Sequence, residues 1–277
     1  MWTFYELKTR AKTVLSQSYW KSLLAILICS LIGGGISLNI NTNSIMTPEF
    51  TNIETAIANN FGLFSGLFSS ILVYSLLVMF FITFPFAVGQ TRFFNESARG
   101  NISLKEIFYP FTNGISNYLN IVKVGFFRLL FLILWGMLSL VVLIPIAIIT
   151  GVVSVISIQN SVFAIIGLIF AVYIALMPMI IKTYEYFFVE YILADEPGIG
   201  WREALKKSKE MTHGNKFRIF LLYLSFMGWF LLGFAFLGFG TIFVMPYVNA
   251  TFTELYLKLK SNIDSEYVYS LTNHEEV

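Results

Sequence analysis

Apolar and polar stretches alternate along the chain, and the apolar ones have the length of membrane-spanning helices. A helix needs about 20 residues to cross the hydrocarbon core of a bilayer. Four stretches of this kind precede one that is about twice as long: Ser22–Ile40, Phe61–Thr91, Leu129–Ile149, Val162–Ile181 and Ile219–Leu257. Gly238 and Gly240 lie near the centre of the longest stretch, and glycine tolerates the positive φ of a tight reversal. The pattern therefore predicts six transmembrane helices.

We expect an all-α fold, a polytopic membrane helical bundle made of three hairpins. A single integral membrane domain covers residues 1–260, and a polar tail covers residues 261–277. The predicted spans lie at about 22–40, 62–91, 121–149, 161–188, 217–237 and 240–257. The first span is expected to be a retained anchor, because its apolar run exceeds the roughly 7–15 residues of a signal-peptide core.

The basic residues occupy alternate connections between the apolar stretches. All 18 lysines and arginines precede the first stretch or follow the second, the fourth or the last. The connections 41–60 and 150–161 contain none. Short cytoplasmic loops carry an excess of Lys and Arg, so we expect a multi-pass protein of the cell membrane with both termini in the cytoplasm.

The composition agrees with a membrane protein and argues against several other classes. Hydrophobic residues make up 57% of the chain and charged residues 12%, against about 45–50% and 25% in soluble domains. A net charge of +2 is too small to indicate a nucleic-acid partner. Cys29 is the only cysteine and lies in an apolar stretch, and His213 and His274 fall in polar segments. We therefore expect no disulfide framework, no metal site and no cofactor.

A short amphipathic segment precedes each predicted pair of spans: Phe4–Leu15, Ile102–Phe111 and Trp201–Met211. The first and third combine an apolar face with basic residues, which is typical of helices that lie in the inner headgroup plane. The aromatic residues expected to anchor the first at the interface are Trp2, Tyr5, Tyr19 and Trp20. The recurrence suggests a threefold repeat of interfacial helix plus hairpin, although membrane-protein composition alone also produces such matches.

Helix-capping signals accompany two of these segments. Ser103 is a candidate N-cap with Glu106 at capping-box spacing. Gly214 follows Trp201–Met211 at the place where a helix C-cap is expected.

The segment Glu190–Tyr256 resembles the C-terminal signature of a family of Gram-positive bacterial integral membrane proteins catalogued as domain of unknown function 975. The stretch from Glu6 to Lys12, with Trp20 and Lys21, is similar to that family's opening. The resemblance implies a six-helix membrane protein and brings no established activity with it. The matching positions, to which it assigns no role, include Asp195, Pro197, Gly198, Ala204, Leu205, Ser208, Gly214, Asn215, Lys216, Leu224, Ser225, Phe226, Gly228, Trp229, Gly238, Gly240, Pro246, Tyr247, Ala250, Thr251 and Tyr256.

Few side chains in the predicted spans are suited to chemistry. Ionisable groups at membrane depth usually mark ion pathways, and spans one to five have none near their centres, which argues against an ion-coupled transporter. Glu254 falls near the inner end of the sixth span. Ser225 lacks the flanking glycines of a nucleophile elbow, so we expect its hydroxyl to bond a backbone carbonyl. Asn249, Thr251 and Thr253 are expected to face the bundle, because lipid offers them no hydrogen-bond partner.

Small residues and prolines in the spans have two interpretations each. Gly62, Gly66 and Ser70 form a stripe that suits close helix packing, within the bundle or in a dimer. The prolines kink helices and would either line a substrate cavity or reflect the frequency of proline in membrane helices: Pro85, Pro145, Pro178 and Pro246.

The sequence Asp195-Glu196-Pro197-Gly198 predicts a type II turn, with proline and glycine at the two central positions. The turn would serve as an elbow, or it would form a docking surface together with the basic helix that follows. Near anionic lipid each of Lys206, Lys207 and Lys209 would gain about 1 kcal/mol, so we favour contact with the lipid surface over partner docking.

These observations predict a non-enzymatic accessory or organising component of the cell envelope. The expected partners are membrane lipids, especially the anionic inner-leaflet surface, and a membrane protein; no nucleic acid is expected. The alternative is a transporter or channel for a small apolar or lipidic substrate. An enzyme is least supported, because no acid, base, nucleophile or metal set can be assembled from the sequence.

Overall fold

The computed structural model describes residues 2–34, 69–156, 161–235 and 238–274. Within these ranges the chain forms helices and turns and contains no strand, which confirms the all-α prediction. The elements in chain order are α1 (Phe4–Gly34), helical residues 69–78, the π-helical turn η2 (Met79–Thr83), α3 (Phe84–Ala98), the 3-10 turn η3 (Leu104–Phe108), α4 (Tyr109–Thr112), α5 (Ile115–Ile156), α6 (Ser161–Glu185), α7 (Val189–Asp195), α8 (Trp201–Thr212), α9 (Lys216–Leu224), α10 (Met227–Ala235) and α11 (Phe239–His274).

Four helical stretches among these residues are long and apolar enough to cross a membrane: Phe4–Ile32, Ser69–Ala98, Ile115–Pro145 and Lys216–Ala235. Each overlaps one of the six predicted spans. Their length and composition indicate a membrane protein. Gly62, Gly66 and the connection 41–60 lie outside the described residues, as do residues 157–160 of the second bare connection.

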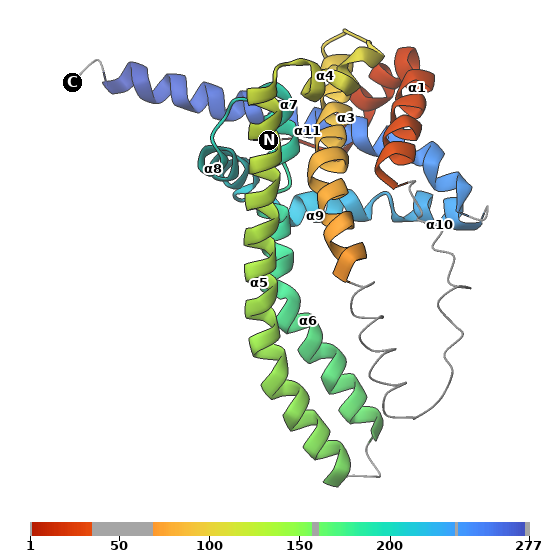
Figure 1. The fold of residues 1–277 in the computed structure, drawn as a ribbon, viewed down its shortest axis with the longest axis vertical. Coiled ribbons are helices and arrows are strands. Elements are labelled where there is room, and N and C mark those ends of the chain that lie inside the picture. The colour runs from red at the N-terminus through yellow and green to blue at the C-terminus, as the bar shows by residue number, and fades with distance from the viewer. Residues whose placement is uncertain (1, 35–68, 157–160, 236–237, 275–277) are drawn as a thin grey trace, which may run out of the picture.

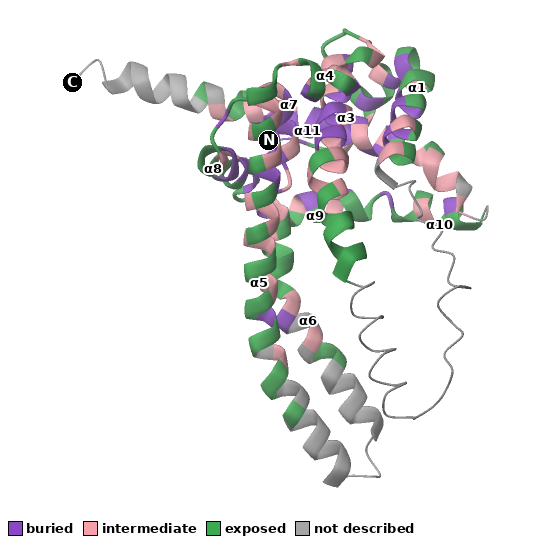
Figure 2. Ribbon diagram, in the orientation of Figure 1, coloured by how far each residue is buried: buried purple, intermediate pink, exposed green. Residues whose placement is uncertain are grey.

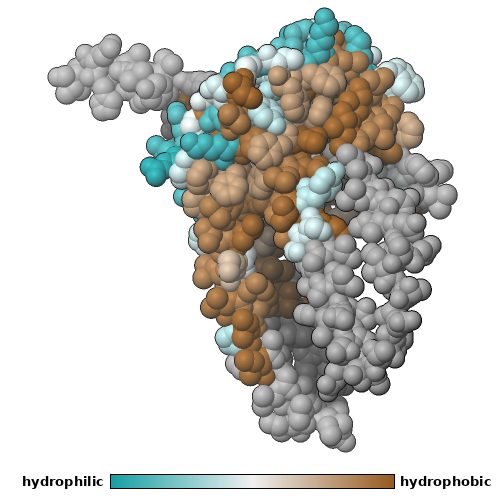
Figure 3. Space-filling model, in the orientation of Figure 1, coloured by the Kyte–Doolittle hydropathy of each residue, from teal (hydrophilic) through white to brown (hydrophobic). Residues whose placement is uncertain are grey.

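The helices divide into a head and a stem (Figure 1). The head consists of α1, α3, α4, α7, α8 and α11, and the stem is the hairpin of α5 and α6 that extends away from it. Buried residues gather in the head, whereas the stem's described surface is mostly exposed or half-buried (Figure 2). On the face drawn in Figure 3, hydrophilic residues lie at the top and beside α8, and hydrophobic residues cover α5. The exposed apolar stem is therefore the part suited to lipid.

Aromatic side chains fill the centre of the head. The ring centroids of Phe188 and Tyr191 on and beside α7 lie 5.5 Å apart, and Tyr256 of α11 lies 5.9 Å and 5.3 Å from them. Phe252 packs on the same cluster. Such aromatic pairs add to the burial of their apolar area, so α11 is fixed as the central helix of the head.

The predicted interfacial helix Phe4–Leu15 and the first span form one continuous helix, α1. Leu7, Ala11 and Leu15 are buried in the head. Trp2 is also buried, and its indole N–H donates to the Asn215 side chain at 3.1 Å. A separate interfacial helix is therefore wrong here, as is an interfacial role for Trp2, because the protein core takes up this apolar face. The other expected anchors differ: Tyr5 and Trp20 are exposed and Tyr19 is half-buried.

The third amphipathic segment forms α8, within one residue of the predicted bounds. Gly214 follows it with φ +71°, which confirms the glycine C-cap. Ala204, Leu205 and Met211 face the core of the head. The apolar face of α8 thus packs on protein, and the expectation that this face inserts into the membrane surface is wrong.

The second amphipathic segment forms η3 and the short α4 instead of one helix. Ser103 occupies the N-cap position, but its side chain makes no capping hydrogen bond. The Glu106 carboxylate lies 2.7 Å from the Arg92 guanidinium Nε. The capping box is therefore wrong, because Glu106 forms an ion pair across to α3 instead of turning back to Ser103.

A π-helical turn lies just before Pro85 in the second span. Proline has no N–H, so the carbonyl of Phe81, four residues earlier, loses its usual helical donor. The Tyr118 hydroxyl of α5 donates to this carbonyl at 2.7 Å. A side chain thus replaces the missing backbone donor.

The reversal between α10 and α11 is at the predicted glycines. Gly238 has φ +83°, a conformation that glycine adopts at little cost. A Cβ on Gly233 would lie 2.7 Å from the Thr241 backbone nitrogen, and a Cβ on Gly240 would lie 2.7 Å from the Gly233 Cα. The two helices therefore approach through glycine on both sides of the turn, which confirms the prediction of a tight reversal.

Candidate functional site

The elbow after α7 contains the predicted turn in a different form. The Ile199 N–H donates to the Glu196 carbonyl at 3.2 Å, with Pro197 and Gly198 at the central positions. A type II turn needs positive φ at its third residue, and Gly198 is not among the described glycines with positive φ. The turn is confirmed and its type II assignment is wrong.

A side chain from the stem determines the orientation of this turn. The Asn120 amide of α5 donates to the carbonyls of Pro197, at 2.8 Å, and Ile199, at 2.7 Å. Type I and type II turns differ in the orientation of the central peptide. Because Asn120 bonds the carbonyl of that peptide, it fixes the orientation without a positive φ at Gly198.

The Asp195 carboxylate is the centre of a buried polar network, which we call the Asp195 junction. Its Oδ1 accepts a hydrogen bond from Asn95 at 3.1 Å. Its Oδ2 accepts from Arg99 at 2.8 Å, Lys260 at 2.7 Å and Tyr256 at 3.1 Å. The Asp195 side chain is only 5% exposed. One carboxylate thus joins the end of α3, the end of α7 and the middle of α11.

The charges at the junction stabilise the ionised acid. Burial alone would raise the pKa of Asp195, but the hydrogen bonds and positive charges of Arg99 and Lys260 lower it to about 2. The same hydrogen bond raises the pKa of Arg99. Asp195 is therefore ionised at neutral pH, whereas a general acid must carry a proton.

Two further cations, Arg92 and Lys207, connect neighbouring segments to the junction. The Arg92 guanidinium donates to the Ala194 carbonyl at 2.6 Å, pairs with Glu106 and lies 3.5 Å from the centroid of the Tyr109 ring. On the other side, Lys207 of α8 pairs with Glu196 at 2.7 Å. These contacts connect η3, α4 and α8 to the end of α7.

Ser208 holds α8 against the segment that connects α6 and α7. Its fully buried hydroxyl donates to the Glu185 carbonyl at 2.7 Å and accepts from the Phe188 N–H at 3.2 Å. The Glu185 carboxylate in turn lies 2.6 Å from Lys182 and 2.5 Å from Lys216 at the start of α9. Two motif residues therefore bind Glu185: Ser208 bonds its backbone carbonyl and Lys216 pairs with its carboxylate.

Other motif residues form local contacts, are buried in α11 or lie on the surface of α10. The Ser225 hydroxyl donates to the Leu222 carbonyl at 2.6 Å, which confirms the expected backbone bond. Thr251 is buried and donates to the Tyr247 carbonyl of its own helix at 2.8 Å. Pro246 is buried in α11. Gly228 and Trp229 lie on the exposed surface of α10, away from the Asp195 junction.

Two other expected bundle-facing residues differ in their surroundings. Thr253 is buried, as predicted. Asn249 is half-buried and donates to the Met245 carbonyl of its own helix at 3.1 Å.

The structure thus brings the two ends of the C-terminal signature into contact. Asp195 lies before α8, and Tyr256 of α11 donates a hydrogen bond to it. The chain belongs to the family described as protein of unknown function (DUF975). The family model matches residues 1–263. No curated protein and no solved structure matches the chain.

Sequence reasoning missed several partners of the motif residues in this DUF975 protein. Asn95, Arg99 and Lys260 bind Asp195 from elements that are distant in sequence. The close approach at Gly233 did have a sequence signal, because this glycine lies seven residues before Gly240 in the same long apolar stretch. For the cations around Asp195 no local signal exists, because their pairing depends on how α3 and α11 pack.

A small cavity of about 250 Å³ lies between η2, α3, α5 and α7 of the DUF975 chain. Its apolar walls include Met79, Phe84 and Leu132. Arg128 and Glu190 also line it and pair at 2.5 Å. This cavity therefore combines an apolar interior with one ion pair in its wall.

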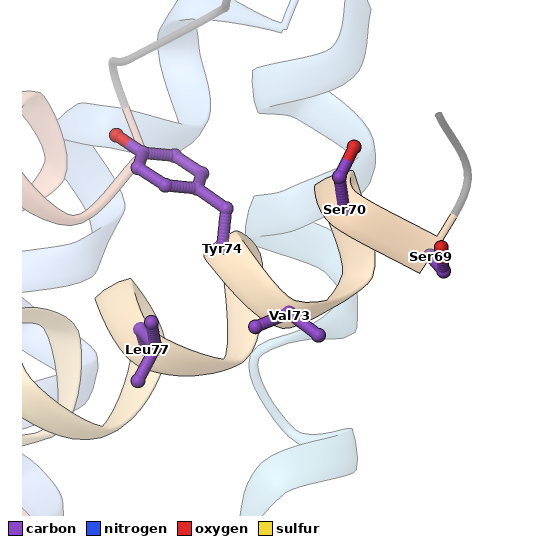
Figure 4. Close-up of a pocket in the computed structure, with 5 residues that line it drawn as sticks. All are labelled: Ser69, Ser70, Val73, Tyr74 and Leu77. Carbon is purple, nitrogen blue, oxygen red and sulfur yellow. The ribbon is translucent and has the colours of Figure 1, made fainter. Parts of the chain in front are cut away.

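A second hollow, of about 390 Å³, runs along one face of the helix formed by residues 69–78 (Figure 4). The described side chains that line it are Ser69, Ser70, Val73, Tyr74 and Leu77. Among the described residues no group of three or more His, Cys, Asp or Glu side chains is arranged to hold a metal ion.

Proposed function

We propose that this DUF975 protein is a non-enzymatic integral protein of a bacterial cell membrane that organises or accompanies another envelope process. The Asp195 junction is the observation that carries this proposal. The Asp195 carboxylate accepts four hydrogen bonds from within the protein. Ser208, Ser225 and Thr251 likewise bond backbone groups. This use of motif side chains suits a rigid scaffold better than a catalyst.

The proposal includes a cytoplasmic head with both chain termini on the cytoplasmic side. It is supported by the distribution of the 18 basic residues over the connections on one side, since Lys and Arg accumulate in cytoplasmic loops. It is also supported by the ion pairs at the Asp195 junction, which join several of these residues to the head.

The proposed partners are anionic lipids of the inner leaflet and a membrane protein. The outer face of α8 is exposed and carries Arg202, Lys206 and Lys209. Because the apolar face of α8 is already packed on the head, contact through α8 would be electrostatic and weakened by salt.

Affinity purification of the tagged full chain from its native membranes tests the proposal. We expect one or a few membrane proteins to copurify with the wild type. A double variant Lys206→Glu and Lys209→Glu should release a partner that binds the basic face of α8. The control double variant Thr9→Glu and Ser16→Glu adds two acidic charges at exposed positions of α1 and should retain the partner. Copurification of lipids alone would contradict an accessory role.

The cavity beside Arg128 favours the second candidate, a transporter or channel for an apolar or lipidic substrate. Its apolar walls and single ion pair suit part of an amphiphile. Flux of fluorescent lipid across vesicles containing the purified protein would test this function. A Leu132→Trp substitution fills the cavity and should reduce flux, whereas Leu140→Trp, at an exposed position of the same helix, should not. Equal flux with and without the protein would exclude this candidate.

A further inference from the structure

The fifth predicted span is broken and lies across the other long helices. Its 20 residues, Lys216–Ala235, form α9 and α10, which Ser225 and Phe226 separate. In Figure 1 the two helices follow one line along the lower edge of the head, crosswise to α3 and to the stem. A span would run in the direction of the stem.

The start of this segment is held at the charged end of α6. Lys216 lies 2.5 Å from Glu185, the last residue of α6, which also pairs with Lys182. The Arg218 guanidinium lies 4.2 Å from the centroid of the Trp2 ring. The first turn of α9 therefore lies beside residues that flank the membrane on the basic side.

The middle of the segment contacts a lysine of the N-terminal flank. The Lys8 Nζ lies 4.5 Å from the centroid of the Phe226 ring. In a span covering residues 217–237, Phe226 would be near the bilayer centre, about 15 Å from either interface. Lys8 belongs to the basic flank before the first apolar stretch. Placing its charged ammonium group at the bilayer centre would cost free energy.

The helix that follows the segment contacts the end of the same basic flank. The Tyr19 hydroxyl of α1 donates to the Phe243 carbonyl at 3.1 Å. Tyr19 immediately precedes Trp20 and Lys21, where the basic flank of the first apolar stretch ends. Phe243 follows Gly238 by five residues, which is about 7.5 Å along a helix. An outer reversal at Gly238 would instead stand about 30 Å from this boundary.

The helix that follows the reversal, α11, is also not placed like a transmembrane helix. Residues from Ala250 to Tyr256 on α11 are all buried within the protein, including Glu254. Farther along, Lys258 pairs with Glu6 at 3.5 Å and Lys260 with Asp195 at 2.7 Å. Protein, and not lipid, surrounds this part of α11 on every side.

The surface that α9 and α10 leave exposed is strongly apolar and aromatic. Its largest exposed side chains are Phe217, Phe220, Tyr223, Trp229, Leu231 and Phe234. Basic residues stand at its start, where Lys216 and Arg218 lie. Trp and Tyr concentrate at the boundary between headgroups and acyl chains, so this surface with basic residues at its start suits that boundary, and the apolar stem continues from the same edge of the head (Figure 1).

We infer that α9 and α10 lie in the plane of the membrane and dock the head on the inner leaflet, with lipid as the partner of their aromatic surface. The third hairpin then does not cross the bilayer. The inference rests on the proposed cytoplasmic side of the basic residues, and it leaves every one of them there, because the chain enters and leaves this hairpin on the same side. It replaces the predicted six spans by four.

Spin labels on the full chain test the inference. Single-cysteine variants Trp229→Cys, Phe234→Cys and Leu140→Cys, each combined with Cys29→Ala, are labelled and placed in vesicles of phosphatidylglycerol and phosphatidylcholine. Collision with oxygen and with a water-soluble nickel complex reports depth. We expect Trp229 and Phe234 at about 5–10 Å below the headgroup boundary. Leu140 on the stem is the control that should lie deep in the core.

Sidedness is measured separately with ascorbate, which does not cross membranes, on right-side-out and inside-out vesicles. We expect the Phe234 label to be reduced only in inside-out vesicles. The exposed Tyr5→Cys label reports the side of the N-terminus. A Trp229 label near the bilayer centre, or one in contact with water and not lipid, would overturn the in-plane arrangement. Reduction of the Tyr5 label from outside would instead overturn the proposed sidedness.

Discussion

The phenol of Tyr256 donates to the carboxylate of Asp195 at 3.1 Å, across 61 residues of chain. Arg99 and Lys260 bind the same carboxylate oxygen. Because α11 follows α10 in sequence, this contact ties the in-plane segment to α7 and α3. One carboxylate therefore connects α11 to the end of α7 and to the end of α3.

Replacing Asp195 by Asn should destabilise the head. Hydrogen bonds to charged groups contribute about 1.5–3 kcal/mol each, and the variant leaves Arg99 and Lys260 without their shared anion. We expect a loss of at least about 1.5 kcal/mol in the free energy of unfolding, measured as a lower melting temperature of the protein in detergent. The control Glu203→Gln changes an exposed carboxylate of α8 and should melt like the wild type. Equal melting of both variants would mean that the junction does not hold the head together.

The junction also predicts how stability depends on pH. The pKa of Asp195 is lowered in the folded state from 3.8 to about 2. A carboxylate with a depressed pKa stabilises the fold fully above its unfolded pKa and loses this contribution as the pH falls through the folded value. The difference in melting temperature between wild type and Asp195→Asn should therefore be constant above about pH 5 and shrink between about pH 4 and 2. A difference that is unchanged at pH 2 would contradict this assignment.

The sequence predicted those features that local physics determines. Gly214 ends α8 and Gly238 turns the chain because both positions have a positive φ, which glycine adopts at little cost. Ser225 bonds a carbonyl in its own turn of chain. Long-range packing decided the rest. Nothing in the periodicity of Phe4–Leu15 distinguishes a lipid surface from a protein core, and nothing local pairs Lys260 with Asp195.

Ser208 offers a test of the contact between α8 and the end of α6. Ser208→Ala removes a buried hydroxyl that serves both the Glu185 carbonyl and the Phe188 N–H. Leaving a buried polar group unsatisfied costs about 1–3 kcal/mol, so the melting temperature should fall. Ser16→Ala removes an exposed hydroxyl that bonds only within α1 and serves as the control. If both variants melt alike, water or another group replaces the Ser208 hydroxyl.

Two glycines of α10 should respond in opposite directions to the same substitution. A Cβ on Gly233 would meet the backbone of α11, 2.7 Å from the Thr241 nitrogen and 3.0 Å from the Gly240 carbonyl carbon. Backbone atoms move only with their helix, so Gly233→Ala must separate α10 from α11, and overpacking of this kind costs about 1–3 kcal/mol. On Gly228 a Cβ would meet nothing within 4 Å.

Gly228→Ala should therefore keep the fold and gain up to about 1 kcal/mol from the better helix propensity of alanine. The comparison is made on the melting temperature in detergent and on the amount of protein that accumulates in the membrane. Both should fall for Gly233→Ala and stay level or rise for Gly228→Ala. Because the two variants share helix, residue type and added methyl group, propensity cancels in the difference. Two variants of equal stability would mean that α10 and α11 do not approach at Gly233 and Gly240, and the tight reversal at Gly238 would lose its packing rationale.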